Sequence, residues 1–186
     1  FKLLVGGDSR SDSNQRRVMN QVMSTLLAAQ PDIIALAHGG DYIESGLRWS
    51  QWQSWLTDHE LTIAGNRLLP VIPVRGNHEA TGSLYDDIWD EPGVTDDNYF
   101  TTTIGKFVMI TLNTNISTGG GQRNYLEQEL IRVTPTARWI TAHYHRPAYP
   151  AVKTPGRALQ NWVPLFEQYN ADLVFESNGH ALKRTV

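Results

Sequence analysis

The sequence contains no cysteine among its 186 residues. This absence excludes a disulfide framework and a thiolate nucleophile, and it argues against a closed structural zinc site. A chain without cysteine suits a protein exported by a bacterium. The sequence does not establish where the protein is located.

Long apolar runs and an excess of positive charge are also lacking. No segment approaches the roughly 18 consecutive apolar residues of a membrane helix, so we expect no membrane span. The net charge is −3 and the isoelectric point is about 6.1. Proteins that bind nucleic acids broadly usually carry a basic surface, so a nucleic-acid partner is not expected.

What is present is the composition of an ordinary globular protein, with 40% hydrophobic and 19% charged residues. A chain of 186 residues can bury a substantial core within one domain. We therefore expect residues 1–186 to form a single domain. The sequence leaves the oligomeric state open.

Apolar runs typical of strands alternate with apolar residues at helical spacing. In the segment 13–29, for example, Val18, Met19 and Val22 belong to an apolar stripe that predicts a helix, which Pro31 ends. Helices are likewise expected around Trp49–Leu56 and over 122–133 and 158–169. Strands are expected over 1–5, 32–37, 68–74, 98–103, 106–113, 137–142 and 171–176, with a hairpin turn at Gly105.

This alternation favours an α/β fold with a largely parallel sheet. Both faces of such a sheet are covered, which accounts for strands that are apolar throughout. Ligands in open α/β sheets bind beyond the carboxyl ends of the strands. The residues at those ends are therefore the first candidates for a functional site, whereas the acidic loop 81–97 is expected on the surface nearby.

Polar side chains gather at five of these strand ends. Carboxylate, amide and imidazole groups together suit a metal such as Zn, Mn or Fe. The candidates are Asp8, Ser9 and Arg10, then His38 and Asp41, then Asn77, His78 and Glu79, then His143, His145 and Arg146, and finally Asn178 and His180.

Each candidate also has a purely structural interpretation. Asp8 and Asp41 could cap helices or tighten turns. His38 fits a hydrogen-bonded core position better than a ligand, and His59 fits a solvated helix face. His143 and His145 alternate at a strand end and are expected to point in opposite directions, so that at most one faces the site. The structural interpretations do not explain why all the candidates stand at one edge.

Taken in order, these motifs resemble the calcineurin-like metallophosphoesterases. The stretches GGDSR (6–10) and HRPAY (145–149) are most similar to the purple-acid-phosphatase-like branch. The resemblance implies an α/β sandwich of two packed mixed β-sheets flanked by helices, with further strands after Val186. The motifs that carry it are Gly7-Asp8, Gly40-Asp41, Gly76-Asn77-His78-Glu79, His145 and Gly179-His180.

The resemblance also implies a reaction and a role for each residue. A small phosphomonoester or phosphodiester would be hydrolysed by a metal-bound hydroxide at two metal ions, which could be Fe, Mn or Zn. His78 would contact the phosphate and assist the leaving oxygen, and Glu79 would orient a neighbouring imidazole. Asp41 would bridge the metals, with Asp8 and His180 on the first and Asn77 and His145 on the second.

Three positions depart from the family pattern. Arg10 replaces a histidine, and it could clamp a substrate phosphate or pair with a nearby acid. Glu44 stands where this branch usually has a tyrosine, so the fourth ligand of the first metal could be Glu44, water or nothing. In the closing motif, Asn178 aligns with the first histidine and His180 with the second, which makes Asn178 a possible oxygen ligand of the second metal.

A shift of that alignment would instead place His180 on the second metal. These departures support an alternative function, in which a degenerate domain binds one metal or none and acts as a binding or scaffold module. Retention of Asn77 and His78 favours the enzyme, because a scaffold has no need of His78.

Overall fold

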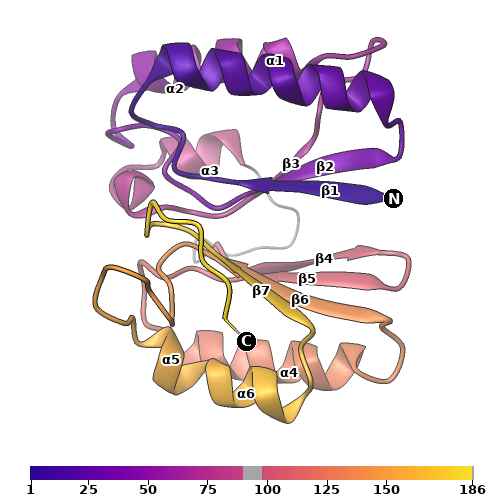
Figure 1. Cartoon of the computed structure of the whole chain (residues 1–186). Helices are drawn as coiled ribbons and strands as arrows, with labels where there is room; N and C mark the ends of the chain where they lie inside the picture. The colour runs from indigo at the N-terminus through magenta and orange to yellow at the C-terminus, as the bar shows by residue number, and fades with distance from the viewer. Residues whose placement is uncertain (90–97, 186) are drawn as a thin grey trace.

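Two β-sheets pack face to face in the computed structural model, which describes residues 1–89 and 98–185 (Figure 1). The first sheet has the order β1-β2-β3 and is parallel, whereas the second has the order β4-β5-β6-β7, in which only the β4–β5 pair is antiparallel. The strands are β1 (Lys2–Gly6), β2 (Ile33–His38), β3 (Val71–Pro73), β4 (Phe100–Ile104), β5 (Phe107–Thr111), β6 (Trp139–Tyr144) and β7 (Leu173–Glu176).

Helices cover the outer face of each sheet (Figure 1). Over the first sheet lie α1 (Ser13–Ala29) and α2 (Trp49–His59), which continues into the 3₁₀ turn η1 (Glu60–Thr62). Under the second sheet lie α4 (Gly120–Val133), α5 (Ala158–Asn161) and α6 (Val163–Gln168). Two short elements, the 3₁₀ turn η2 (Asn77–Glu79) and α3 (Leu84–Ile88), follow β3.

The apolar core consists of separate layers, one between the two sheets and one between each sheet and its helices. Ala37, Ile72 and Met109 are buried between the two sheets, with Phe100 and Phe175 packed against them. A larger cluster lies between the second sheet and α4, α5 and α6. At roughly 25 cal/mol per Å² of buried apolar surface, these layers supply the main stabilisation of the fold.

The α/β architecture of two sheets flanked by helices is confirmed. The parallel strands do not form one central sheet, however, because they are divided between the two sheets. The predicted hairpin exists as β4 and β5, with Gly105 in a left-handed conformation at φ +60°. A left-handed turn residue is typical of such hairpins.

Helix α1 has the predicted bounds, but only the second part of the predicted apolar stripe, formed by Met23, Leu26 and Leu27, packs into the core. Asp12 caps it, since its side chain accepts hydrogen bonds from the backbone N–H groups of the second and third helical residues. Val18, Met19 and Val22 are exposed, whereas Arg16 is buried against α2. Polar residues turn inward in the first half of the helix because Arg16 forms an ion pair with the buried Asp58 of α2 at 2.6 Å.

Two other elements differ from the prediction because of proline. The strand expected over 68–74 shortens to β3, since Pro70 and Pro73 have no N–H group to donate to a ladder. The helix expected over 158–169 divides into α5 and α6 at Trp162, with Pro164 in the first turn of α6.

The carboxyl ends of the parallel strands lie at one edge of the molecule, on the left in Figure 1. This edge carries the polar residues singled out above. In the acidic loop, residues 81–89 include α3, whose Tyr85 is buried, while residues 90–97 lie outside the described residues. None of the helices in the described part of the chain has the length and apolar character needed to cross a membrane.

Candidate metal centre

Two carboxylates stand directly after β1 and β2, at the centre of the candidate site. The backbone N–H of Asp8 donates to the Gly40 carbonyl at 2.9 Å, so the parallel pairing of the strands continues into both loops. Asp8 and Asp41 have φ angles of +53° and +57°. This left-handed conformation costs a non-glycine residue about 1–2 kcal/mol, and such strain is concentrated at functional sites.

The loop after β3 approaches Asp41 so closely that Gly76 must be a glycine. A Cβ atom on Gly76 would lie 2.1 Å from the Asp41 backbone nitrogen and 2.4 Å from its Oδ1 atom. Any side chain at this position would therefore push Asn77 and His78 away from Asp41.

The buried carboxylate of Glu79 holds these loops together. Its Oε2 atom accepts from the N–H groups of Gly76 and Asp41 at 3.0 and 2.9 Å, and its Oε1 atom accepts from those of Tyr42 and Ile43 at 2.9 and 3.2 Å. Burial raises the pKa of Glu79 to about 7, with a further increase from the charge of Asp41, while hydrogen bonds from the backbone oppose the shift. The expectation that Glu79 orients an imidazole is wrong, because it orients backbone instead.

His145, after β6, presents one ring nitrogen to the site. Its Nδ1 atom lies 2.6 Å from the Gly39 carbonyl oxygen, which can only accept, so Nδ1 carries the proton. The other nitrogen, Nε2, lies 3.2 Å from both Asp41 Oδ1 and Asn77 Oδ1. A neutral imidazole thus brings three acceptor atoms to one point, and this arrangement requires a cation there. The cation is either a proton on Nε2 or a metal ion.

The pKa values of Asp41 and His145 follow from the close approach of these atoms. Burial opposes the charged form of both Asp41 and His145, but the hydrogen bond and charge between them are stronger. The pKa of Asp41 is held well below its usual range, helped by the backbone N–H of His78, and the pKa of His145 is raised. The carboxylate of Asp41 therefore favours positive charge at Nε2 of His145.

A second group of donor atoms lies on the other side of Asp8. His180 Nε2 is 3.1 Å from Asp8 Oδ1, and ligand atoms of Asp8, Asp41 and His180 all lie within 4.8 Å of one another. The backbone N–H of Asn178 donates to Asp8 Oδ2 at 2.9 Å. The side-chain oxygen of Asn178 accepts from Lys153 at 2.7 Å, so this side chain is held by the 145–157 loop.

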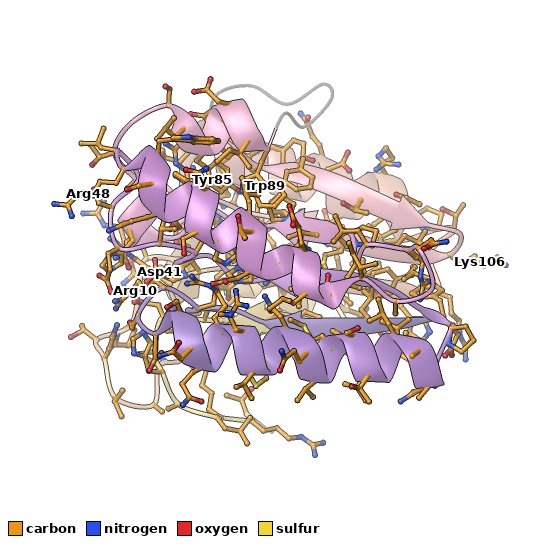
Figure 2. The ribbon with its side chains drawn as sticks, turned by 90° about the horizontal axis from the view of Figure 1, so that it is seen from above. Arg10, Asp41, Arg48, Tyr85, Trp89 and Lys106 are labelled. Atoms are coloured by element: carbon orange, nitrogen blue, oxygen red, sulfur yellow. The ribbon has the colours of Figure 1, made fainter. Side chains whose placement is uncertain are left out.

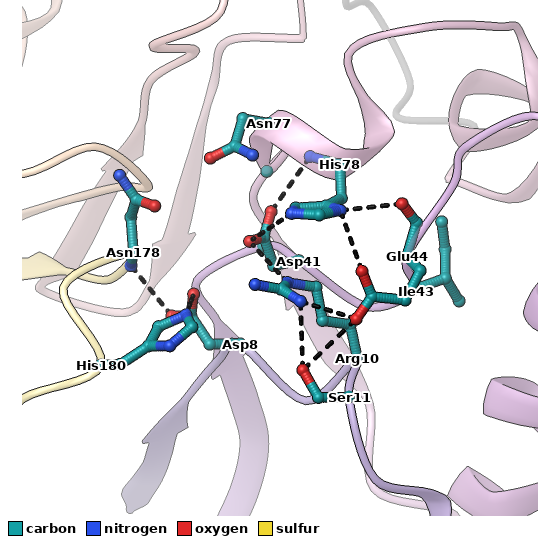
Figure 3. Close-up of polar contacts among 12 residues, drawn as sticks. Asp8, Arg10, Ser11, Asp41, Ile43, Glu44, Asn77, His78, Asn178 and His180 are labelled. Atoms are coloured by element: carbon teal, nitrogen blue, oxygen red, sulfur yellow. Dashed lines mark hydrogen bonds and ion pairs between the residues drawn. The ribbon is translucent and has the colours of Figure 1, made fainter.

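Arg10 forms ion pairs with two acidic residues, Asp41 and Glu44 (Figure 3). Its Nε atom donates to Asp41 Oδ2 at 3.2 Å, and its Nη1 atom donates to Glu44 Oε1 at 2.6 Å and to the Ser11 hydroxyl at 3.1 Å. Of the two interpretations of Arg10, pairing with nearby acids is therefore present in this structure. The Nη2 atom takes no part in these contacts.

His78 is fixed in orientation by two loops. Its backbone N–H donates to Asp41 Oδ1 at 3.1 Å, and its Nδ1 atom donates to the Glu44 carbonyl oxygen at 2.8 Å (Figure 3). Because Nδ1 carries that proton, the free position of the ring is Nε2, which lies 3.9 Å from Asp41 Oδ2. His78 thus presents Nε2 towards the same carboxylate that faces His145 and Arg10.

His38 occupies a hydrogen-bonded position in the core, as predicted. It stacks on Tyr42, with ring centroids 4.0 Å apart, and its Nε2 atom lies 3.0 Å from the Ser9 hydroxyl. Trp55 Nε1 donates to the same hydroxyl at 3.0 Å. The pKa of His38 is lowered well below the usual value by burial, and then by neighbouring histidines.

Two predictions about other histidines are wrong. His143 and His145 are two residues apart on a strand and therefore share one face, so both lie buried on the side of β6 that faces the first sheet. It is Tyr144 that points the other way, against Trp162 and Phe166. His59 is buried rather than solvated, because it closes the end of α2 with Nε2 2.8 Å from the Leu69 carbonyl oxygen.

Sequence reasoning missed Arg75, although a charge at the end of a buried strand is a usable signal. Its buried guanidinium donates to the Glu79 and Gly82 carbonyl oxygens, to Asn98 and to Asp86. The side chain of Asn115 donates to the carbonyl oxygens of Arg75 and Gly76 at 3.1 and 3.0 Å. These two residues fix the turn that presents Asn77 and His78.

A family model described as calcineurin-like phosphoesterase matches residues 3–182. Two Mycobacterium tuberculosis proteins, uncharacterized protein MT2654 and uncharacterized protein Rv2577, are each 24% identical to this chain over 177 residues. The match covers 78% of this chain and 34% of each relative, so the chain spans about a third of the length of these proteins.

Solved structures with the same fold include a purple acid phosphatase, PPD1 from yellow lupin seeds. It has a TM-score of 0.75 and 16% identity, over 95% of this chain and 37% of that one. GAP50 of Plasmodium, described as the anchor in the inner membrane complex, has a TM-score of 0.70 and 14% identity, over 92% and 64% of the two chains. A dimetal phosphatase from Danio rerio has a TM-score of 0.70 and 10% identity, over 93% and 78%. At these identities the likeness shows the fold alone.

Proposed function

This chain belongs to the calcineurin-like phosphoesterase family, and on that premise we propose that it hydrolyses phosphate esters at a centre of two metal ions. The substrate is a small phosphomonoester or phosphodiester. The observation that carries the proposal is the convergence of acceptor atoms at His145 Nε2, where Asp41 and Asn77 each place an oxygen 3.2 Å away.

The donor set fits two cations of the Fe, Mn or Zn class. Asp41, Asn77 and His145 would hold one ion, and Asp8, Asp41 and His180 would hold the other. Asp41 belongs to both groups and would bridge them. Oxygen and imidazole ligands without thiolates suit these metals, and the Nδ1 hydrogen bond of His145 to a carbonyl oxygen is typical of a metal-ligating histidine.

Asn178 has a different role in this proposal. Its backbone N–H orients the Asp8 carboxylate, while its side chain binds Lys153. Direct ligation by the Asn178 side chain would require it to leave Lys153.

Bound metal ions would supply a water activated at neutral pH and would neutralise charge on the phosphate. The ring of His78 lies on the Oδ2 side of the Asp41 carboxylate, whereas His145 lies on the Oδ1 side. The Nδ1 proton of His78 is engaged by the Glu44 carbonyl, so Nε2 faces the phosphate. With a second proton on Nε2, the imidazolium ring gives that proton to the leaving oxygen and returns to the neutral form. Arg10 stays paired with Asp41 and Glu44 and offers its Nη2 edge to the phosphate oxygens.

A binding module with one metal or none is the second candidate function. Arg10 already supplies a positive charge to Asp41 Oδ2, and Lys153 already engages Asn178. GAP50, a similar structure, is described as an anchor. In this alternative, the positive charge of Arg10 replaces part of the charge that metal ions would otherwise present to Asp41.

Hydrolysis of p-nitrophenyl phosphate and bis-p-nitrophenyl phosphate tests the proposal. The metal-free protein is reconstituted separately with Mn, Zn and Fe, and each preparation is assayed beside an Asp41→Ala variant. The proposal predicts metal-dependent release of nitrophenol by the unmodified protein only. Absence of hydrolysis with all three metals, in protein that binds them, would favour the binding module.

A further inference from the structure

Positive charge is concentrated in two loops beside the metal centre, although the chain as a whole is acidic. The loops 145–157 and 177–185 contain five of the 16 lysines and arginines and none of the 19 acidic residues. We call these five residues the cationic lip. Its members are Arg146, Lys153, Arg157, Lys183 and Arg184.

The two loops form one surface because side chains connect them. Lys153 donates to the Asn178 side chain at 2.7 Å, and Lys183 donates to the Tyr149 carbonyl oxygen. Both loops begin at the carboxyl ends of β6 and β7, on the left side of Figure 1, and the second then turns back so that its end lies near the middle of the molecule. The cationic lip therefore begins at the edge that carries the donor atoms of the metal centre and extends back from it.

A cavity joins one side of the metal centre to part of the lip. Its volume is about 900 Å³, and its lining includes Asp8 and His180 together with Lys183 and Arg184. The other three lip residues do not line this cavity; of these, Arg146 follows the proposed ligand His145 directly in the sequence. A molecule held at Asp8 and His180 can thus extend to Lys183 and Arg184 within the cavity.

Acidic partners neutralise little of this charge. Asp172 and Glu176 also line the cavity, but Asp172 accepts from the Ile140 N–H at the far end of β7, and Glu176 is paired with Lys183. Among the described residues, Arg146, Arg157 and Arg184 form no ion pair, and all three are exposed. Three guanidinium groups therefore remain available to an anionic ligand.

We propose that the cationic lip binds a second phosphate group of the substrate, so that the preferred substrate is a small molecule with two or more phosphates. This inference rests on the proposed function for the identity of the first group, a phosphoester at the metal centre. Guanidinium groups suit phosphate because their planar N–H donors match its oxygens. The lip is confined to two loops of an acidic chain, which favours a small polyanion over a nucleic acid.

Non-hydrolysable phosphonates test the lip independently of catalysis. Metal-reconstituted protein is titrated calorimetrically with butylphosphonate and with butane-1,4-bisphosphonate, which differ by one phosphonate group. We expect the bisphosphonate to bind about tenfold more tightly, and this preference should decrease as salt is raised. Longer alkane bisphosphonates then measure the span between the centre and the lip.

Arg157→Gln and Arg184→Gln are the test variants, and Lys106→Gln is the matched control. Lys106 is a cation in the β4–β5 turn, at the opposite end of the molecule from Arg10 and Asp41 (Figure 2). Each test variant should weaken bisphosphonate binding about two- to fivefold and change butylphosphonate binding less than twofold. The control should change neither.

Equal affinity for the two phosphonates, or equal losses in the test and control variants, would overturn the proposal. So would tight binding of a single-stranded oligonucleotide that depends on the same arginines, if the bisphosphonate shows no preference. Because phosphonates are not hydrolysed, an inactive protein that retains the bisphosphonate preference would overturn only the proposed function and would leave the lip in place.

Discussion

The guanidinium of Arg10 lies 3.2 Å from Oδ2 of Asp41, on the opposite side of the carboxylate from His145, whose Nε2 atom lies 3.2 Å from Oδ1. The two oxygens of Asp41 thus each face a cation or a group that can become one. This arrangement places Arg10 close to the phosphate in the proposed mechanism. It also makes Arg10 the residue that separates the two candidate functions most clearly.

Replacement of Arg10 by glutamine should lower kcat/KM for an aryl phosphate about tenfold to a hundredfold, mainly through KM. The reason is the loss of a charge-assisted hydrogen bond to the phosphate, which contributes about 1.5–3 kcal/mol. Arg10→Lys should recover part of the loss, because it keeps the charge but not the planar donors. Unchanged kcat/KM in Arg10→Gln with full metal content would mean that Arg10 only pairs with Asp41 and Glu44.

His78→Ala should reduce kcat about 10²- to 10⁴-fold, the range for loss of a general acid or base. Metal content should stay at the level of the unmodified protein, because His78 presents Nε2 to the phosphate and not to a metal in this account. Elemental analysis of the same sample separates the two roles. Loss of metal from His78→Ala would show that His78 is a ligand.

Arg75→Met should lower the free energy of unfolding by about 3–5 kcal/mol, as measured by urea denaturation. The substitution leaves the partners of a buried guanidinium, among them Asn98 and the Glu79 carbonyl, without a donor. Arg67→Met is the matched control, because Arg67 makes one 3.3 Å contact to the Pro31 carbonyl oxygen at an exposed position. That control should cost less than about 1 kcal/mol. Similar losses in both variants would show that Arg75 does not organise this turn.

His59 predicts a pH dependence of stability that does not involve the metal centre. Burial lowers the pKa of His59 below 6.5, partly offset by its bond to the Leu69 carbonyl. Above pH 6.5 neither state binds the proton, and below it the unfolded state binds the proton first. The stabilisation is therefore lost as pH falls from 6.5 towards the folded pKa, at up to about 1.4 kcal/mol per pH unit.

Urea unfolding of the metal-free protein between pH 5 and pH 8 measures this dependence. His59→Gln should show a smaller decrease below pH 6.5 than the unmodified protein, because glutamine can still donate to Leu69 but does not titrate. Identical pH profiles for the two proteins would contradict the assignment.

The pH dependence that remains in His59→Gln has two sources of opposite sign. The buried His38 and His143, whose pKa values are also lowered, to about 3 for His143, destabilise the protein as pH falls. Glu79 and His145, whose pKa values are raised, destabilise it as pH rises.

The periodicity of the sequence predicts most of the helices and strands because the spacing of apolar residues is a local signal, whereas the two-sheet architecture was expected only from the family resemblance. The bounds of α1 and the hairpin at Gly105 follow from capping, proline and turn chemistry close in the chain. The burial of Arg16 on α1 could not be predicted, since it depends on Arg16 meeting Asp58, which is 42 residues away. The division into two sheets likewise depends on tertiary packing that periodicity does not encode.

For the site, the sequence indicated which residues gather but not how each one is oriented. Asp8, Asp41, Asn77, His145 and His180 do lie together at one edge. The orientation of His145 depends on the Gly39 carbonyl, and that of the Asn178 side chain depends on Lys153, in each case through contacts between distant segments. The contacts of Glu79 could not be predicted, because its four backbone donors come from two loops that are distant in the sequence.

The central claim is that Asp41 joins two groups of metal ligands, and metal stoichiometry tests it most directly. Elemental analysis of protein reconstituted with Mn, Zn or Fe should give two ions per chain for the unmodified protein. It should give close to none for Asp41→Ala, because both groups lose the carboxylate that they share. One ion or fewer in the unmodified protein, or two ions retained by Asp41→Ala, would contradict the account.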